Sequence, residues 1–294
     1  MADPGGRFRR DCNRANFTFK HGLAGNTLFE LSALAALARR GGALGPHYWA
    51  SGAVPAGGGW SDGTVGRQTL PDTITNIEHN DSIVILRSVE QDPMFAPLLQ
   101  NLLVDIVELT GERMRADVAA GEVAVVLNSP ERITPYHMDA DPAFHLLIAG
   151  EHSIHVFDHA DRTLVSAREL EDFYAVGRRR AECRPGRLND SNDHELLAGD
   201  GVHVPGGAPH WAKNHGRVSI ALRVSYVLRS VERLRTLHRF NRRLRRLGLT
   251  PAPPGVAPWR DRLKLAAANS FNALRASHGG AAGGRQGPVW RPPK

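Results

Sequence analysis

The feature that most constrains the fold is a run of short, β-rich segments between residues 122 and 227. Several of them alternate apolar and polar residues, and glycine, proline, asparagine or aspartate punctuates the run. The segments are 122–128, 136–140, 143–148, 153–157, 201–204, 212–214 and 218–227. Closely spaced short strands of this kind are typical of an antiparallel sandwich or barrel. We therefore predict a mainly β core.

Helical periodicity flanks this core on both sides. Residues 93–113 carry apolar side chains at helical spacing, and the same period returns at 230–247 and 261–275. The sequence also predicts helices at 28–40, 71–78 and 167–176 and a strand at 82–87. Polar or glycine-rich composition predicts irregular segments at 1–25, 41–66 and 184–195.

These changes of pattern divide the 294 residues into four parts. We expect a helical and loop region that packs on the barrel, the barrel with an insertion at 166–200, a pair of basic helices suited to dimerisation, and a flexible tail. The helical and loop region is 1–120 and the barrel is 121–228. The basic helices are 229–277 and the tail is 278–294.

Charge and cysteine content narrow the functional classes. The net charge is +7, and residues 229–294 hold 15 Lys and Arg but only two acidic residues. A basic end of this kind can bind nucleic acid, an acidic peptide or an acidic patch of a partner subunit, or it can be a solvated helix surface. Two cysteines exclude a disulfide framework and a cysteine zinc site, which favours the cytoplasm. No apolar stretch approaches the ~20 residues that span a bilayer.

The candidate chemistry lies at His137 and Asp139. Residues two apart on a strand point to the same face, so this imidazole and carboxylate can hold one metal ion. His210, which follows a Gly-Asp turn beginning at Gly199, is the best candidate for a third ligand. Two histidines and one carboxylate leave three positions open on an octahedral ion, which suits Fe(II) and O₂ chemistry. The pair alone is better explained as two unrelated surface residues. Its place on a predicted strand, with a Gly-Asp turn leading to His210 about 60 residues later, favours the metal.

The sequence resembles the cupin-like and JmjC-type 2-oxoglutarate-dependent oxygenases over residues 121–228. The shared motifs are Thr-Pro-x-His-x-Asp at 134–139, FHLLIAGEHSIHVF at 144–157 and Gly-Asp-x₄-Pro-x₄-His at 199–210, with 218–226 as the closing strand. The resemblance implies a double-stranded β-helix, or jelly roll, in which His137, Asp139 and His210 bind Fe(II). It also implies that 2-oxoglutarate chelates the metal. Because Asp139 occupies the carboxylate position, hydroxylation is the expected outcome.

The far carboxylate of 2-oxoglutarate needs a hydroxyl and a cation inside the barrel. Thr134 matches the hydroxyl of the family, but His152 stands where the family usually has a lysine. We therefore expect Arg223, on the closing strand, to bind the carboxylate, with help from Thr134 and His152. His145 is a further candidate for the lining of the pocket.

Together these observations predict an Fe(II)- and 2-oxoglutarate-dependent dioxygenase that uses O₂ to hydroxylate an amino-acid side chain. The substrate would be a peptide, a protein or a small amino-acid-like metabolite, and the C-terminal helices would form a homodimer. One alternative is a hydroxylase directed at RNA or the ribosome through the basic end. Another, which the absence of a lysine at His152 keeps open, is a cupin that binds metal or ligand without catalysis.

Overall fold

The structure is a computed structural model that describes residues 1–3, 5–40, 48–57, 68–176, 184, 186–277 and 290–291. Its helices are α1 (Arg7–Asp11), η1 (Thr27–Phe29), α2 (Leu31–Arg40), α3 (Leu70–Thr75), η4 (Val89–Gln91), α4 (Ala96–Thr110), α5 (Glu112–Asp117), α6 (Ala167–Val176), α7 (Arg229–Arg246) and α8 (Pro258–Ser277). Its strands are β1 (Phe17–Lys20), β2 (Tyr48–Ser51), β3 (Ser82–Leu86), β4 (Val118–Asn128), β5 (Ile133–Met138), β6 (Ala143–Ala149), β7 (Glu151–Val156), β8 (Asn192–Leu197), β9 (Asp200–Val204), β10 (Pro209–Asn214) and β11 (Ser219–Leu228).

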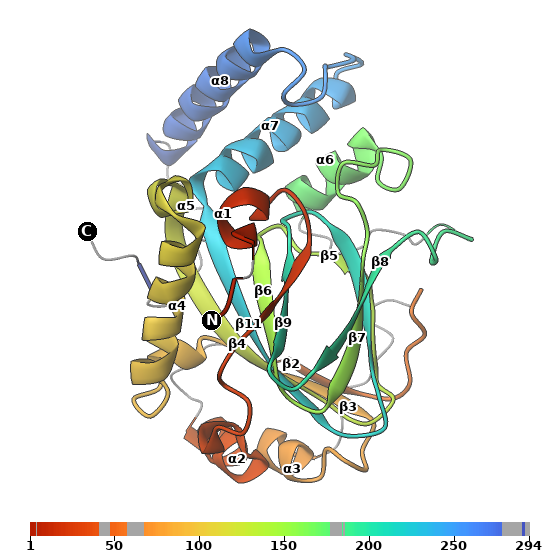
Figure 1. Cartoon of the computed structure of the whole chain (residues 1–294). Helices are drawn as coiled ribbons and strands as arrows, with labels where there is room; N and C mark the ends of the chain where they lie inside the picture. The colour runs from red at the N-terminus through yellow and green to blue at the C-terminus, as the bar shows by residue number, and fades with distance from the viewer. Residues whose placement is uncertain are drawn as a thin grey trace.

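Two antiparallel sheets face each other and form the predicted jelly roll (Figure 1). The larger sheet has the order β1-β9-β6-β11-β4-β3-β2, and the smaller has the order β5-β10-β7-β8. The chain therefore passes repeatedly from one sheet to the other, as the resemblance implied. The mainly β fold with flanking helices is confirmed.

Apolar packing covers the outer face of the larger sheet and leaves its inner face to other groups. Leu99 and Leu103 of α4 are buried with Val123, Val125 and other residues of the sheet. The buried hydroxyl of Tyr226 donates to the backbone oxygen of Leu103 at 2.8 Å, which fixes β11 against this helix. The main core thus lies between α4 and the sheet, and a smaller apolar cluster that includes Ile154 and Val202 joins the two sheets.

Three strands occupy segments for which the sequence predicted irregular structure. β1 lies within 1–25 and pairs with β9, and β2 lies within 41–66 and pairs with β3. β8 begins within 184–195 and pairs with β7, so the insertion returns to the smaller sheet. All three expectations were wrong for the same reason: edge strands are short and half exposed, so they lack a strong apolar pattern. The residues of 41–66 outside 48–57 are not among those described.

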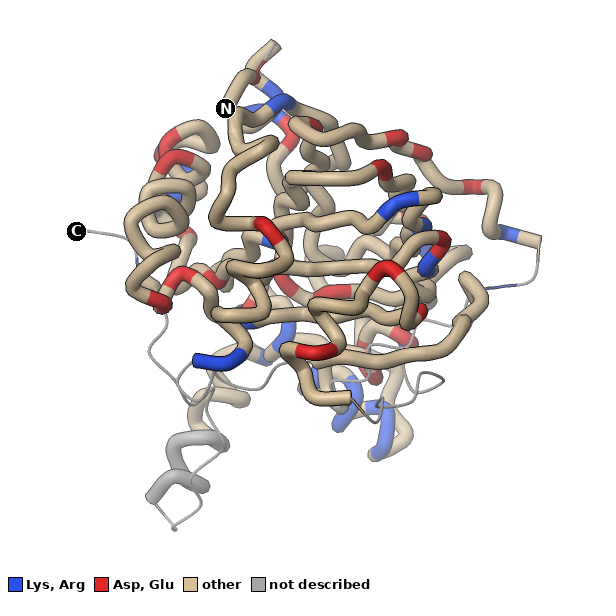
Figure 2. Tube along the Cα trace, turned by 90° about the horizontal axis from the view of Figure 1, so that it is seen from below, with Lys and Arg blue, Asp and Glu red and all other residues tan. Residues whose placement is uncertain are grey.

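The basic helix α7 packs along the acidic helix α6. Arg245 pairs with the buried Glu171 at 2.8 Å, and Arg242 pairs with Asp172 at 2.5 Å. Acidic residues elsewhere are spread over the strands and their turns (Figure 2). Part of the positive charge on α7 is therefore neutralised within the chain.

The end of the chain returns to the barrel. The backbone N–H of Gly121 donates to the oxygen of Trp290 at 3.0 Å, and the Trp290 ring packs edge-on against Tyr226. The rest of the predicted tail at 278–294, apart from residues 290–291, lies outside the described residues. Within the described part of the chain, no helix is long and apolar enough to cross a membrane.

Candidate metal centre

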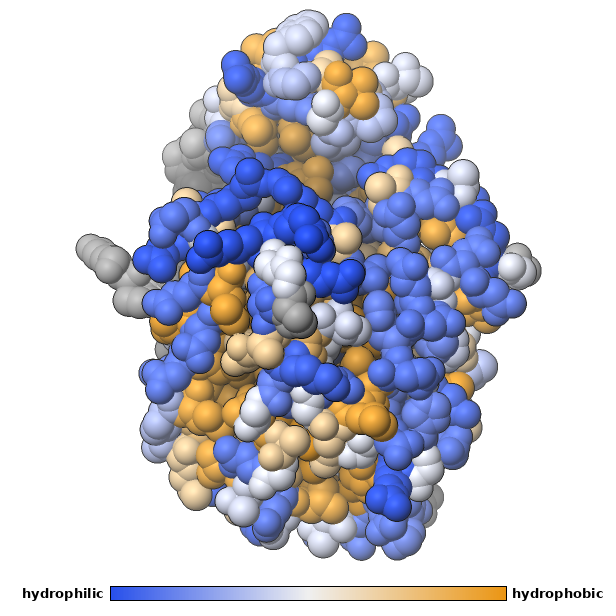
Figure 3. Space-filling model, in the orientation of Figure 1, coloured by the Kyte–Doolittle hydropathy of each residue, from blue (hydrophilic) through white to orange (hydrophobic). Residues whose placement is uncertain are grey.

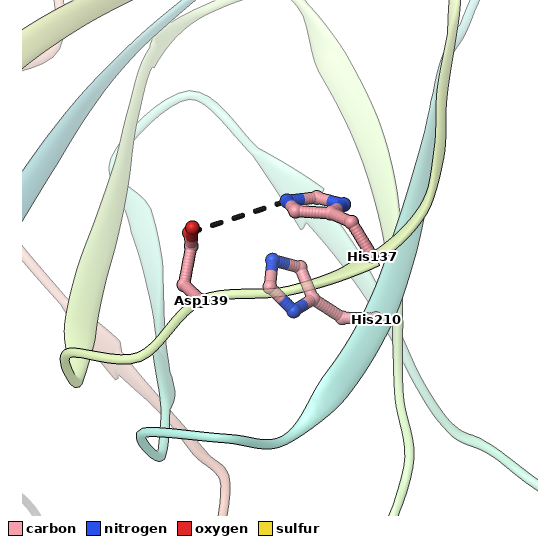
Figure 4. A group of neighbouring side chains, drawn as sticks. All are labelled: His137, Asp139 and His210. Carbon is pink, nitrogen blue, oxygen red and sulfur yellow. Dashed lines mark ion pairs between the residues drawn. The ribbon is translucent and has the colours of Figure 1, made fainter. Parts of the chain in front are cut away.

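The three predicted ligands meet inside the barrel. His137 lies on β5, Asp139 follows the end of that strand, and His210 lies directly opposite His137 on β10. One ligand atom from each of the three lies within 4.8 Å of the others. The Nε2 atom of His137 is 4.0 Å from Oδ2 of Asp139, and all three side chains point toward one another (Figure 4). No other group of three such side chains stands out as a metal site among the described residues.

Backbone contacts orient both imidazoles for metal binding. Nδ1 of His137 lies 2.8 Å from the carbonyl oxygen of Pro135, and Nδ1 of His210 lies 3.0 Å from that of Ala208. Since a carbonyl oxygen only accepts, each Nδ1 carries a proton, and in the neutral ring Nε2 then has the lone pair that a metal needs. The same arrangement fixes the ring and tautomer of histidine ligands in metal sites. The donor set therefore fits a divalent ion of the Fe(II) type.

Arg223 contacts the carboxylate ligand directly. A terminal N–H of its guanidinium donates to Oδ2 of Asp139 at 2.7 Å, and the two side chains are only 19% and 15% exposed. Burial is the largest single influence on the pKa of Arg223 and lowers it, but the charge and hydrogen bond of Asp139, with the charges of Glu122 and Asp141, together raise the pKa. The sequence predicted Arg223 as a binder of 2-oxoglutarate; its contact with Asp139 was not predicted. This contact fixes the carboxylate beside His137, whose Nε2 lies 4.0 Å from the same oxygen.

A cavity between the sheets extends from the metal ligands into the barrel. Thr134, His145, His152 and Arg223 all line it, as do the three ligands and apolar side chains such as Ile154. Nε2 of His145 and Nδ1 of His152 are buried and have no hydrogen-bond partner among the described residues. A buried nitrogen without a hydrogen-bond partner lowers the stability of the fold, so this pair favours binding of a polar ligand.

Both of these histidines are neutral near pH 7. Burial lowers the pKa of His152 to about 4. For His145, burial first and then the charges of Arg223 and His210 lower the pKa well below its usual value. Neither imidazole therefore supplies the cation that the family places inside the barrel.

The strand register orders the polar groups by depth. On β10, His210 lies opposite His137, Ala212 opposite Thr134, and Asn214 opposite His152. Each step of two residues along a strand is about 7 Å. Thr134 thus lies about 7 Å farther along the barrel than the metal ligands, one step deeper, and His152 lies about two such steps deeper.

At the end that holds the metal ligands, the cavity adjoins a second, charged cleft. Arg87, Asp139 and Arg223 line both spaces. The cleft has a volume of about 270 Å³ and is also lined by Glu122, Asp141, Phe173, Tyr174, Arg235 and Arg239. These residues could not be predicted from the sequence as a group, because they come from strands, from α6 and from α7 and share no motif. Because this cleft adjoins the metal centre, we call it the entrance cleft, or entrance.

Comparison with known proteins bears on the fold. Two crystal structures of the ribosomal oxygenase YcfD of Escherichia coli match the chain at a TM-score of 0.50, with 15% and 14% sequence identity. The matches cover 95% of this chain and 68% and 69% of the YcfD chains. A further YcfD structure, in complex with cobalt and 2-oxoglutarate, matches at a TM-score of 0.47, with 14% identity over 92% of this chain and 67% of that chain.

The sequence itself matches no protein-family description and no curated protein. At such low identity the YcfD structures establish the fold and nothing finer. They confirm the jelly roll with helical extensions that the resemblance to cupin-like and JmjC-type oxygenases implied.

Proposed function

We propose that this protein is an Fe(II)- and 2-oxoglutarate-dependent oxygenase that hydroxylates its substrate. The observation that carries the proposal is the trio of His137, Asp139 and His210, whose ligand atoms converge within 4.8 Å at one end of an internal cavity. Three protein ligands on one side of an ion leave room for a chelating cosubstrate and O₂. When bound, Fe(II) with 2-oxoglutarate and O₂ would supply the oxidising power for an unactivated C–H bond.

The chain's own residues would bind, orient and shield these groups. Arg223 holds Oδ2 of Asp139, so the carboxylate keeps its orientation before a metal enters. Because Arg223 is bound to Asp139 at the metal end, the neutral Thr134 and His152 would donate hydrogen bonds to the far carboxylate of 2-oxoglutarate in place of a cation. The unpartnered Nε2 of His145 would contact the cosubstrate near the metal. Apolar side chains such as Ile154 keep bulk water out of the cavity.

The charged entrance suits an amino-acid side chain as substrate. Arg235 lies 3.7 Å from Asp141 at this cleft, and Arg239 donates to the backbone oxygen of Tyr174 at 2.8 Å. A cleft with both signs of charge and a Tyr174 hydroxyl offers partners to the backbone and side chains of a peptide. We therefore favour a peptide or protein over a small amino-acid-like metabolite. Because the ribosomal oxygenase YcfD has a similar fold, a ribosomal substrate is the second candidate.

A homodimer through the C-terminal helices belongs to the same proposal. Trp259 and Leu263 of α8 are 61% and 62% exposed, and Leu247 and Val256, in the segment before it, are 77% and 70% exposed. Exposed apolar groups clustered in one region favour a protein interface. Replacing Trp259 and Leu263 together by serine should convert a dimer to a monomer in sedimentation. The cytoplasmic location expected from the cysteine content also stays part of the proposal.

Consumption of the cosubstrate tests the proposal. The purified protein, supplied with Fe(II), ascorbate and isotope-labelled 2-oxoglutarate in air, should release labelled succinate slowly even without its substrate. The His137→Ala variant should release none. Tight metal binding without any succinate from the wild-type protein would instead support a non-catalytic binding protein.

A further inference from the structure

A second large cleft lies on the other side of α7 from the entrance. Arg233 lines it, whereas Arg235 lines the entrance, and residues two apart on a helix point about 200° apart. The cleft has a volume of about 510 Å³ and lies between α1, α5 and the start of α7. None of the proposed metal ligands lines it, so it is separate from the metal centre.

Four arginines from three parts of the chain converge on this cleft. Arg9 lies on α1, Arg14 follows that helix, Arg113 lies on α5 and Arg233 on α7. All four are exposed, and the stem of Arg9 lies over Gly111. Figure 3 shows the most hydrophilic residues gathered over α1, α5 and the start of α7.

These four guanidinium groups have no acidic partner among the residues that the structure describes. No ion pair within 4.0 Å joins any of them to a carboxylate of the described chain. The single carboxylate in the lining, Asp117, already accepts from the backbone N–H of Ser230 at 2.8 Å and from its hydroxyl. Arginines nearby behave differently: Arg10 on α1 pairs with Asp11 at 2.9 Å.

Unpaired like charges around one cleft repel each other, and an anion relieves that repulsion. Guanidinium forks match the oxygens of a phosphate group, and the side-chain NH₂ group of Asn13 adds a neutral donor to the lining. The volume exceeds what one phosphate needs, and four separated arginines suit several phosphates in a row.

We propose that this cleft binds phosphate groups carried by an RNA strand or a nucleoside polyphosphate. Arg9, Arg14, Arg113 and Arg233 would contact the phosphates, and the site would work without the metal centre. The inference goes beyond the proposed oxygenase activity and does not depend on it.

Fluorescence anisotropy with a short, labelled single-stranded RNA tests this site. The full chain is used, and the cleft variant carries Arg113→Glu and Arg233→Glu. A matched control carries Arg217→Glu and Arg262→Glu, two exposed positions outside the cleft with the same change in net charge. Circular dichroism and melting temperature confirm that both variants fold.

Wild-type protein should bind the RNA with a salt slope of about −2.8, from about four contacts at about −0.7 each. Loss of two contacts should bring the slope to about −1.4 and weaken binding about tenfold at physiological salt. The control should keep both values. Competition by ATP at micromolar concentration would identify a nucleotide as the source of the phosphates, and its absence would identify an RNA strand.

Three results would overturn the proposal. The first is no RNA or nucleotide binding at low salt. The second is equal weakening in the cleft variant and in the control, because binding would then follow net charge alone. The third is displacement of RNA by poly-glutamate at equal charge concentration, which would assign the cleft to acidic peptides.

Discussion

Replacing Arg223 by methionine removes the group that holds Asp139, and two effects on metal affinity then oppose each other. Loss of a positive charge near a dication tightens metal binding. Loss of the 2.7 Å hydrogen bond lets the carboxylate rotate away from the ion. Partners of metal ligands typically contribute 10–100-fold to metal affinity, or about 1.4–2.7 kcal/mol. We expect orientation to outweigh charge and binding to weaken by that factor.

Arg87→Met separates the two effects. Arg87 also lines the cavity, but its guanidinium lies 3.8 Å from Glu122. The two variants remove the same charge from the same cavity. Anaerobic calorimetric titration with Fe(II), or with Co(II) as a stable substitute, should show weaker binding for Arg223→Met and unchanged or tighter binding for Arg87→Met.

Tighter metal binding by both variants would contradict this expectation. If both variants bind the metal more tightly, Arg223 acts only as a charge and does not position Asp139. A lysine at position 223 adds a further check, because it keeps the charge and lacks the planar fork. Arg223→Lys should recover part of the affinity that Arg223→Met loses.

Three other predictions concern the ligands, acid stability and one turn. His210→Ala should abolish Fe(II) binding in the same titration while the circular dichroism spectrum stays native. Burial lowers the pKa to about 4, 3 and 4 at His152, His203 and His238. Between pH about 6.5 and 4 these histidines therefore bind protons only in the unfolded chain. The free energy of unfolding should fall by about 4 kcal/mol per pH unit over this range, which urea midpoints measure. Flat urea midpoints over this range would contradict it. Gly150→Ala should cost at least about 2 kcal/mol of unfolding free energy, because φ is +85° and the new Cβ would lie 2.5 Å from the carbonyl oxygen of Val218. Gly216→Ala, in open space, is its control.

The sequence was most informative where neighbouring residues share one strand. His137 and Asp139 are two residues apart, so strand periodicity alone places them together, and the Gly-Asp turn pointed to His210. Central strands such as β11 were predicted because burial on both faces enriches them in apolar residues. The polar edge strand β8 was not predicted, because Leu196 is its only buried residue and gives no apolar alternation.

Contacts that depend on the register between distant strands could not be predicted. Arg223 reaches Asp139 because β11 pairs with β6 so that Arg223 lies opposite His145. Nothing in the local sequence fixes that alignment. The four-arginine cleft could not be predicted either. Its residues range from Arg9 to Arg233 and meet only through the packing of α1, α5 and α7.

An anaerobic titration of the metal-free protein with Fe(II) and 2-oxoglutarate, followed in the visible, tests the central claim most directly. A keto acid chelated to Fe(II) gives a weak metal-to-ligand charge-transfer band. The account predicts that this band forms in the wild-type protein and is lost in His137→Ala. Tight Fe(II) binding with no band on adding 2-oxoglutarate would contradict it.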